Sequence, residues 1–244
     1  MQHAVILLLG INNAGTIGGY FGAGTTTHPN KGYTLVPPCA QANYTNGNFP
    51  GSVQTQAVGI NNGSPPVTVG FWVDANGSNF GFVNQNGSFT NVNNPNTPAT
   101  VPSVNPLLGA NDLNVAAGFY VDMNGDAQAY LYSIGGNSFS PIILPISFNA
   151  TMTTATGVND SGVVSGFYVD NAGNTHGFID KAGSFTSLDD PMANGNTMFL
   201  GLNNLGQLVG SFVDGNDLTH GLVYNSPTAP SSSSHVLSKE AALQ

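Results

Sequence analysis

Residues 157–178 read GVNDSGVVSGFYVDNAGNTHGF, and this segment is the clearest copy of a repeat that predicts the fold. Its first four residues are glycine, an aliphatic residue, asparagine, and then asparagine or aspartate. This tetrapeptide occurs five times, starting at Gly10, Gly59, Gly109, Gly157 and Gly201. The spacings between successive copies are 49, 50, 48 and 44 residues. A period of this length indicates a repeat architecture in which each copy is one supersecondary unit.

The fourth copy predicts four short strands, over 153–159, 162–170, 175–180 and 184–188, with turn residues between them. The Asn-Asn/Asp pair is followed by a residue suited to a left-handed turn position. In the five copies these residues are Gly15, Gly63, Asn114, Gly162 and Gly206. The second hairpin of a copy begins with an aspartate that can bond to its own turn, at Asp74, Asp122, Asp170 and Asp214. The pattern predicts an antiparallel meander in every copy.

The second strand of each copy has adjacent bulky residues, as in Gly166-Phe167-Tyr168-Val169. Because side chains alternate along a strand, such a sheet is apolar on both faces and must be sandwiched. We therefore predict an all-β, five-bladed β-propeller of four-stranded antiparallel blades. The glycine of each first strand then lies where five backbones crowd around the axis. A β-solenoid is the alternative, but its coils are commonly about 20–30 residues, whereas propeller blades are about 40–50.

A shared period predicts one domain over residues 1–225, and residues 226–244 form a Pro/Ser-rich tail. The last copy stops after its third strand. Its fourth strand is expected from residues 234–237 or from residues 3–8, and the second choice would join the two chain ends in one blade.

Charged residues make up only 6% of the chain, the formal net charge is −9, and lysine is the only strong cation. Such a surface cannot neutralise phosphates, which argues against nucleic acid and anionic membranes as partners. No stretch reaches the 18–20 apolar residues of a membrane span, so we expect no membrane insertion. Residues 4–9 lack a basic flank and are predicted to be a strand, and any export signal is expected outside this chain.

The offsets in residues 157–178 resemble those of bacterial extracellular repeats named for a His-Ala-Phe tripeptide. The tripeptide site reads His176-Gly177-Phe178 in the fourth copy and His220-Gly221-Leu222 in the fifth. The resemblance covers residues 3–225, with His3-Ala4-Val5 as a third instance. It implies a secreted or surface-attached repeat protein and no particular reaction. The first copy departs most, at Gly22-Ala23-Gly24 and at Pro37-Pro38-Cys39.

Few residues suggest catalysis. The turn aspartates are spaced a blade apart and are interpreted as structural, and the repeated His176 and His220 as packing or bonding to a neighbouring blade. Cys39 has no basic partner nearby in sequence and is expected to be inert. No cofactor is predicted. Calcium is a weak alternative at Asp122, Asn124 and Asp126, which have the spacing of a calcium loop but no downstream glutamate.

The candidate ligand-binding residues are the five repeated asparagines and two tyrosines. Asn12, Asn61, Asn111, Asn159 and Asn203 are expected to circle one channel mouth, offering amides to water, an ion or a sugar, unless each amide simply closes its own turn. The unrepeated segments 25–52 and 91–106 are further candidates. Tyr33 and Tyr44 in the first of them could stack on sugar rings if exposed.

We therefore expect a secreted or cell-surface, non-enzymatic propeller that binds a glycan or protein, or copies of itself in a homo-oligomer, fibre or lattice. Whether it catalyses a reaction stays open. The alternative is a polysaccharide-active hydrolase or lyase at the channel mouth, which would need acidic or histidine residues such as Asp112, Asp160 and His28 to converge there.

Overall fold

The computed structural model describes residues 5–99 and 102–225, which form five antiparallel sheets in chain order, the blades of a β-propeller. Blade 1 contains β1 (Val5–Ile11), β2 (Ile17–Gly22), β3 (Lys31–Leu35) and β4 (Tyr44–Asn46). Blade 2 contains β5 (Gln54–Ile60), β6 (Val67–Val73), β7 (Asn79–Gln85) and β8 (Ser88–Val92). The short β9 (Val104–Asn105) pairs in parallel with β7.

The remaining blades repeat this order. Blade 3 contains β10 (Leu107–Ala110), β11 (Val115–Val121), β12 (Ala127–Ser133) and β13 (Ser138–Pro141). Blade 4 contains β14 (Ala150–Val158), β15 (Val163–Asp170), β16 (Thr175–Lys181) and β17 (Ser184–Leu188). Blade 5 contains β18 (Thr197–Leu202), β19 (Gln207–Val213) and β20 (Thr219–Asn225). Two 3₁₀ turns, η1 (Gln41–Asn43) and η2 (Ile146–Phe148), are the helical elements of the described residues, none of which is long and apolar enough to span a membrane.

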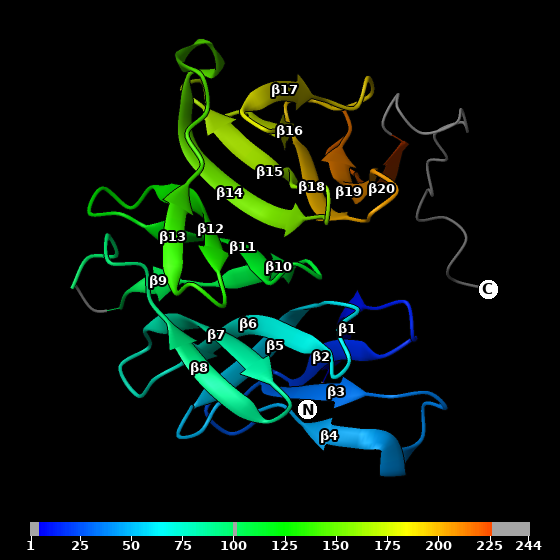
Figure 1. Cartoon of the computed structure of the whole chain (residues 1–244). Helices are drawn as coiled ribbons and strands as arrows, with labels where there is room; N and C mark the ends of the chain where they lie inside the picture. Colours follow the sequence, from blue (N-terminus) through cyan, green and yellow to red (C-terminus); the bar gives the residue numbers. More distant parts are fainter. Residues whose placement is uncertain (1–4, 100–101, 226–244) are drawn as a thin grey trace.

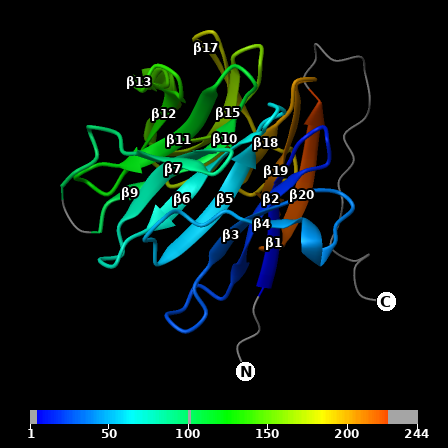
Figure 2. The same ribbon diagram turned by 60° about the horizontal axis from the view of Figure 1, so that its bottom comes forward.

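Consecutive blades pack face to face, with the first strand of each blade against the preceding sheet. Figure 1 shows the blades following one another in an arc from the blue strands of blade 1 to the orange strands of blade 5, and Figure 2 gives a second view. The hydrophobic core is divided among the interfaces between blades. One buried cluster joins blades 2 and 3 through Val69, Leu107 and Tyr130, and another joins blades 3 and 4 through Ala117 and Phe178.

The five-bladed β-propeller predicted from the repeats is confirmed, and the strands of the fourth copy lie within a few residues of their predicted bounds. One prediction about blade 5 is wrong. Its fourth strand does not come from residues 3–8, because β1 is the innermost strand of blade 1 and pairs with β2. The other candidate, residues 234–237, lies outside the described residues, as does the predicted tail.

The turn chemistry is confirmed at four of the five first hairpins, where φ is positive at Gly15, Asn114, Gly162 and Gly206. Gly63 is the exception. In that copy the asparagine side chain bonds to the backbone six residues later rather than four, because the turn is longer. The longer loop removes the need for a left-handed residue at Gly63.

Candidate functional site

The five repeated asparagines lie in the hairpins that follow the first strand of each blade. The Oδ1 atom of each accepts hydrogen bonds from two backbone N–H groups of its own turn, as Asn111 does from Leu113 and Val115 at 3.0 and 2.9 Å. The equivalent pairs of bonds are present at Asn12, Asn61, Asn159 and Asn203. The interpretation that each amide closes its own turn is thus supported by the geometry.

The Nδ2 atoms of four of these asparagines also link neighbouring blades. Each donates a hydrogen bond to the backbone carbonyl of the equivalent asparagine in the next blade, from Asn12 to Asn61, Asn61 to Asn111, Asn111 to Asn159, and Asn159 to Asn203. Asn203 instead donates to Gln207 of its own blade at 2.8 Å. The middle three asparagines are buried. Their amides therefore hold the turn and the next blade, and their binding of a ligand stays a prediction.

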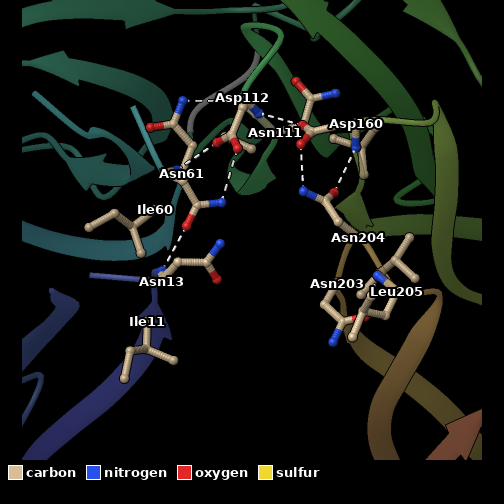
Figure 3. A pocket seen from close by; sticks show the side chains of 14 residues that line it. Ile11, Asn13, Ile60, Asn61, Asn111, Asp112, Asp160, Asn203, Asn204 and Leu205 are labelled. Carbon is tan, nitrogen blue, oxygen red and sulfur yellow. Dashed lines mark hydrogen bonds between the residues drawn. The ribbon is translucent and has the colours of Figure 1, made fainter. Parts of the chain in front are cut away.

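The residue after each of these asparagines faces the channel mouth. These residues are Asn13, Asn62, Asp112, Asp160 and Asn204. Together with aliphatic side chains and three of the repeated asparagines, Asn61, Asn111 and Asn203, they line a cavity of about 390 Å³. The aliphatic lining comes from the ends of the first strands, including Ile11 and Ile60, and from Leu205. Figure 3 shows this mixed lining from close by.

A second chain of hydrogen bonds runs around this mouth from blade to blade. The backbone N–H of each residue bonds to the side-chain oxygen of the equivalent residue in the next blade, from Asn13 to Asn62, Asn62 to Asp112, Asp112 to Asp160, and Asp160 to Asn204. The Asn62 and Asn204 amides also donate to the carboxylates of Asp112 and Asp160, respectively. The polar rim is therefore held in place before any ligand binds.

Asp112 and Asp160 make the mouth acidic. They are neighbours in the rim, where the backbone N–H of Asp112 bonds to Oδ1 of Asp160 at 2.8 Å. Sequence reasoning placed these two aspartates at the mouth correctly for the hydrolase alternative, but His28 does not join them. It lies in the connection between β2 and β3, at the opposite end of the blade from the hairpins that form the mouth.

Sequence reasoning missed Asn13, Asn62 and Asn204 as rim residues. The signal was present in the fourth position of the repeated tetrapeptide, which is asparagine or aspartate in every copy. Only the structure shows that the fourth-position side chain borders the cavity in all five blades, whereas the third-position asparagine does so in three.

The two tyrosines do not form an exposed aromatic platform. Tyr33 is buried, and its hydroxyl donates to the backbone carbonyl of Leu7 at 3.1 Å. Burial, with the nearby Tyr44, raises the pKa of Tyr33 to about 12. Tyr44 is half-buried against Tyr33, with ring centroids 4.7 Å apart. The expected exposure is wrong for Tyr33, because the ring fills the space above Gly19, which has no side chain.

The turn aspartates lie at the end of the blades opposite the mouth. Oδ1 of Asp122 accepts the backbone N–H groups of Asn124 and Asp126, and Oδ2 accepts the side-chain amide of Gln128. The pKa of the Asp122 carboxyl is lowered, because these hydrogen bonds outweigh the effect of desolvation. The same turn bonds form at Asp74, Asp170 and Asp214. The calcium alternative at Asp122 stays a prediction.

The repeated histidines bond within their own blades and stack on Tyr168 and Phe212, so the packing alternative is supported and the bond to a neighbouring blade is not. His176 contacts Asp189 through Nδ1 at 2.7 Å and Asp170 through Nε2 at 3.3 Å. His220 contacts Asp214 at 2.9 Å and stacks on Phe212. The turn aspartate and the histidine six residues later therefore bond to each other and stabilise the same hairpin. Cys39 is an exposed free thiol.

No model of a known protein family matches the chain, and no curated protein matches its sequence. The resemblance to His-Ala-Phe repeat proteins therefore stays a prediction. Several solved structures are similar to the chain in fold.

One is a mutant of the lectin from Aleuria aurantia in complex with α-methyl-L-fucoside, with a TM-score of 0.57 and 11% identity over 96% of this chain and 76% of that one. Another is a structure of a lectin from the same fungus, described as a six-bladed β-propeller with a novel mode of fucose recognition. It matches with a TM-score of 0.57 and 9% identity over 96% of this chain and 76% of that one. TolB from Acinetobacter baumannii matches with a TM-score of 0.61 and 13% identity over 90% of this chain and 51% of that one. At these identities the likeness shows a shared β-propeller fold.

Proposed function

We propose that this chain is a non-enzymatic, carbohydrate-binding β-propeller that takes neutral glycans at its channel mouth. The observation that carries the proposal is the mouth itself, a cavity of about 390 Å³ with a preformed amide and carboxylate rim over aliphatic side chains. Its size lies within the range of small-ligand pockets.

The chemistry of the rim suits sugars. Carboxylates such as Asp112 and Asp160 accept strong hydrogen bonds from hydroxyl groups, and the Asn13 side chain offers both a donor and an acceptor. The aliphatic side chains of Ile11, Ile60 and Leu205 can pack against the C–H face of a sugar ring. Because the rim is acidic and the chain carries a net charge of −9, uronic acids and sulfated sugars should be repelled.

The lectins of similar fold support this class of ligand, since they show that a propeller can present a sugar site, and one of them is in complex with a fucoside. Binding is favoured over hydrolysis because His28 lies at the other end of the blade, and because Asp112 and Asp160 are both engaged with backbone N–H groups. The low charge and the polar, amide-rich composition, with the repeat resemblance, lead us to place this activity outside the cell or on its surface.

The test is a glycan array with neutral and acidic sugars, followed by calorimetry on the best ligand. Asp160→Asn should weaken binding at least about tenfold, because a hydrogen bond to a charged group contributes about 1.5–3 kcal/mol. The fold should tolerate the change, since Asn62 and Asn204 occupy the equivalent position. The glycan should be recovered uncleaved after incubation with the protein, because the proposal is binding without hydrolysis.

Asp217→Asn is the matched control. It removes the same charge from an exposed turn at the opposite end of the blade, at a left-handed position that asparagine accepts. Absence of binding to every neutral glycan, or equal affinity in the Asp160→Asn and wild-type proteins, would contradict the proposal.

A further inference from the structure

The two ends of the blade array expose sheet faces that are buried at every other interface. Leu8 of β1 is 60% exposed, whereas the equivalent residues of the other blades are at most 2% exposed, namely Ala57, Leu107, Ala155 and Phe199. Ile6 is likewise exposed beside its cross-strand neighbour Phe21. We call Ile6, Leu8 and Phe21 the Leu8 face. In blades 2–5 the preceding blade covers this face, and no described residue covers it in blade 1.

Blade 5 shows the complementary exposure on its other side. Val209 of β19 is 50% exposed, whereas the equivalent Val69, Ala117 and Ser165 are fully buried by the blade that follows. Val223 pairs with Val209 across the sheet, and the neighbouring Gly221 is exposed although its equivalents in blades 2–4 are buried. We call Val209, Gly221 and Val223 the Val209 face. Blades 1 and 5 therefore do not bury each other as the other neighbours do.

The hydrogen bonds of the channel mouth have matching open ends. Four interfaces use a backbone N–H of one blade and the side-chain oxygen of the next, and the series ends at Asn204. In Figure 3 the dashed lines connect the rim as far as Asn204 and do not continue from it to Asn13. Within residues 5–99 and 102–225, the Asn204 N–H therefore lacks the oxygen of a following blade, and the Asn13 side chain lacks the N–H of a preceding one. Each end carries the group that the other end needs.

We propose that a second copy of this chain covers these faces, with the Leu8 face of one copy packed on the Val209 face of the next. The four interfaces within the chain already demonstrate that such faces are complementary, so the contact continues a packing that the molecule uses throughout. Exposed apolar patches of this kind mark protein–protein contacts in soluble proteins.

The contact is directional because its two faces differ. A heterologous contact of this kind closes into a ring if the rotation between copies permits, and otherwise grows into a filament. Asn13 of the second copy would accept the hydrogen bond from the Asn204 N–H, so the rim of one channel mouth is extended by the next copy. The assembly does not depend on glycan binding, which is tested at Asp160.

Light scattering on size-exclusion fractions tests the proposal with two variants, each of which introduces one charged residue into one of the two faces. Wild-type protein should form assemblies larger than a dimer that grow with concentration. Leu8→Asp and Val209→Asp should each be monomeric, because each loses one of the two faces. An equimolar mixture of these variants should give a 1:1 dimer and nothing larger, since each variant retains the face that the other has lost.

Ile146→Asp is the matched control, because Ile146 is 95% exposed in η2 and belongs to neither face. It should assemble as the wild type does, and thermal unfolding should show all three variants folded. A mixture that stays monomeric would overturn the directional contact, and a single variant that dimerises on its own would instead indicate that like faces pack together.

Two other ways of covering the Leu8 face and the Val209 face can be distinguished from a second copy by experiment. If blade 5 closes directly on blade 1, the wild type stays monomeric and an Asn13→Cys/Asn204→Cys pair cross-links within one chain. If residues 226–244 cover a face, the wild type stays monomeric and assembles when they are deleted. Either result overturns the proposal.

Discussion

At the scale of single residues, His176 shows how a repeated position acquires a role in stability. Burial alone would lower the pKa of its imidazole, but the hydrogen bonds and charges of Asp189 and Asp170 outweigh burial and raise it above 6.5. The backbone N–H of Asn174 and the other hydrogen bonds of the turn hold the pKa of Asp170 down at about 2. The protonated histidine therefore lies between two carboxylates.

This arrangement predicts a pH-dependent contribution to folding. A pKa raised in the folded state stabilises fully below the unfolded value, near 6.5, and the stabilisation disappears as the pH rises through the folded value. His176→Gln should thus reduce the free energy of unfolding more at pH 5.5 than at pH 9, as measured by urea titration. Equal losses for His176→Gln at the two pH values would contradict the assignment.

At the scale of the strand, the strictest sequence requirement lies in the second strand of each blade. The first strand has a register shift just before its repeated glycine, as between Ala155 and Gly157. Opposite this irregularity, Gly166 has no room for a side chain, because a Cβ atom would lie 2.0 Å from the carbonyl oxygen of Thr154. The same close approach occurs at Gly19, Gly70, Gly118 and Gly210. The strand pair therefore requires glycine for steric reasons, although φ is not positive there.

Gly166→Ala should lower the free energy of unfolding by about 3 kcal/mol or more, because the backbone of β14 must move to admit the methyl group. Gly215→Ala is the control, since nothing lies within 4 Å of its Cβ position, and it should change stability by less than about 1 kcal/mol. Chemical denaturation compares the two variants. Similar stability in both would show that the first strand tolerates displacement.

At the scale of the whole molecule, the blades form a linear series of four interfaces. In such an array each unit depends mainly on its neighbours, so the end units are held on one side only. Blade 3 is packed on both faces, whereas blade 1 and blade 5 each expose one face.

Native-state hydrogen exchange on dilute, monomeric protein should therefore detect lower protection at the ends. Backbone amides of β2 and β19 are expected to exchange at least about tenfold faster than those of β11, since the end blades lack one of the two interfaces that protect blade 3. Gly70 and Val69 in β6 of blade 2, which is also packed on both sides, provide an internal reference. Uniform protection across β2, β11 and β19 would indicate a ring closed between blades 1 and 5.

The number of blades, the four-strand meanders of blades 1–4 and most of the turns could be predicted from the sequence. These features arise from local chemistry that is repeated at a fixed spacing, such as the left-handed residues at Gly162 and Asn114 and the aspartate turn at Asp170. The sequence also predicted a channel mouth circled by the five repeated asparagines, of which Asn61, Asn111 and Asn203 line the cavity; their binding of a ligand stays a prediction.

How these units meet depends on contacts between residues far apart in the chain, which the sequence pattern does not specify. The Asn111 amide reaches a carbonyl 48 residues away, Tyr33 is buried by contacts with other strands, and Leu8 is exposed although its equivalents are not. Such properties depend on which blade lies on either side. A periodic sequence specifies each face in nearly the same way, and the physical difference between a buried and an open face comes from the neighbour that covers it.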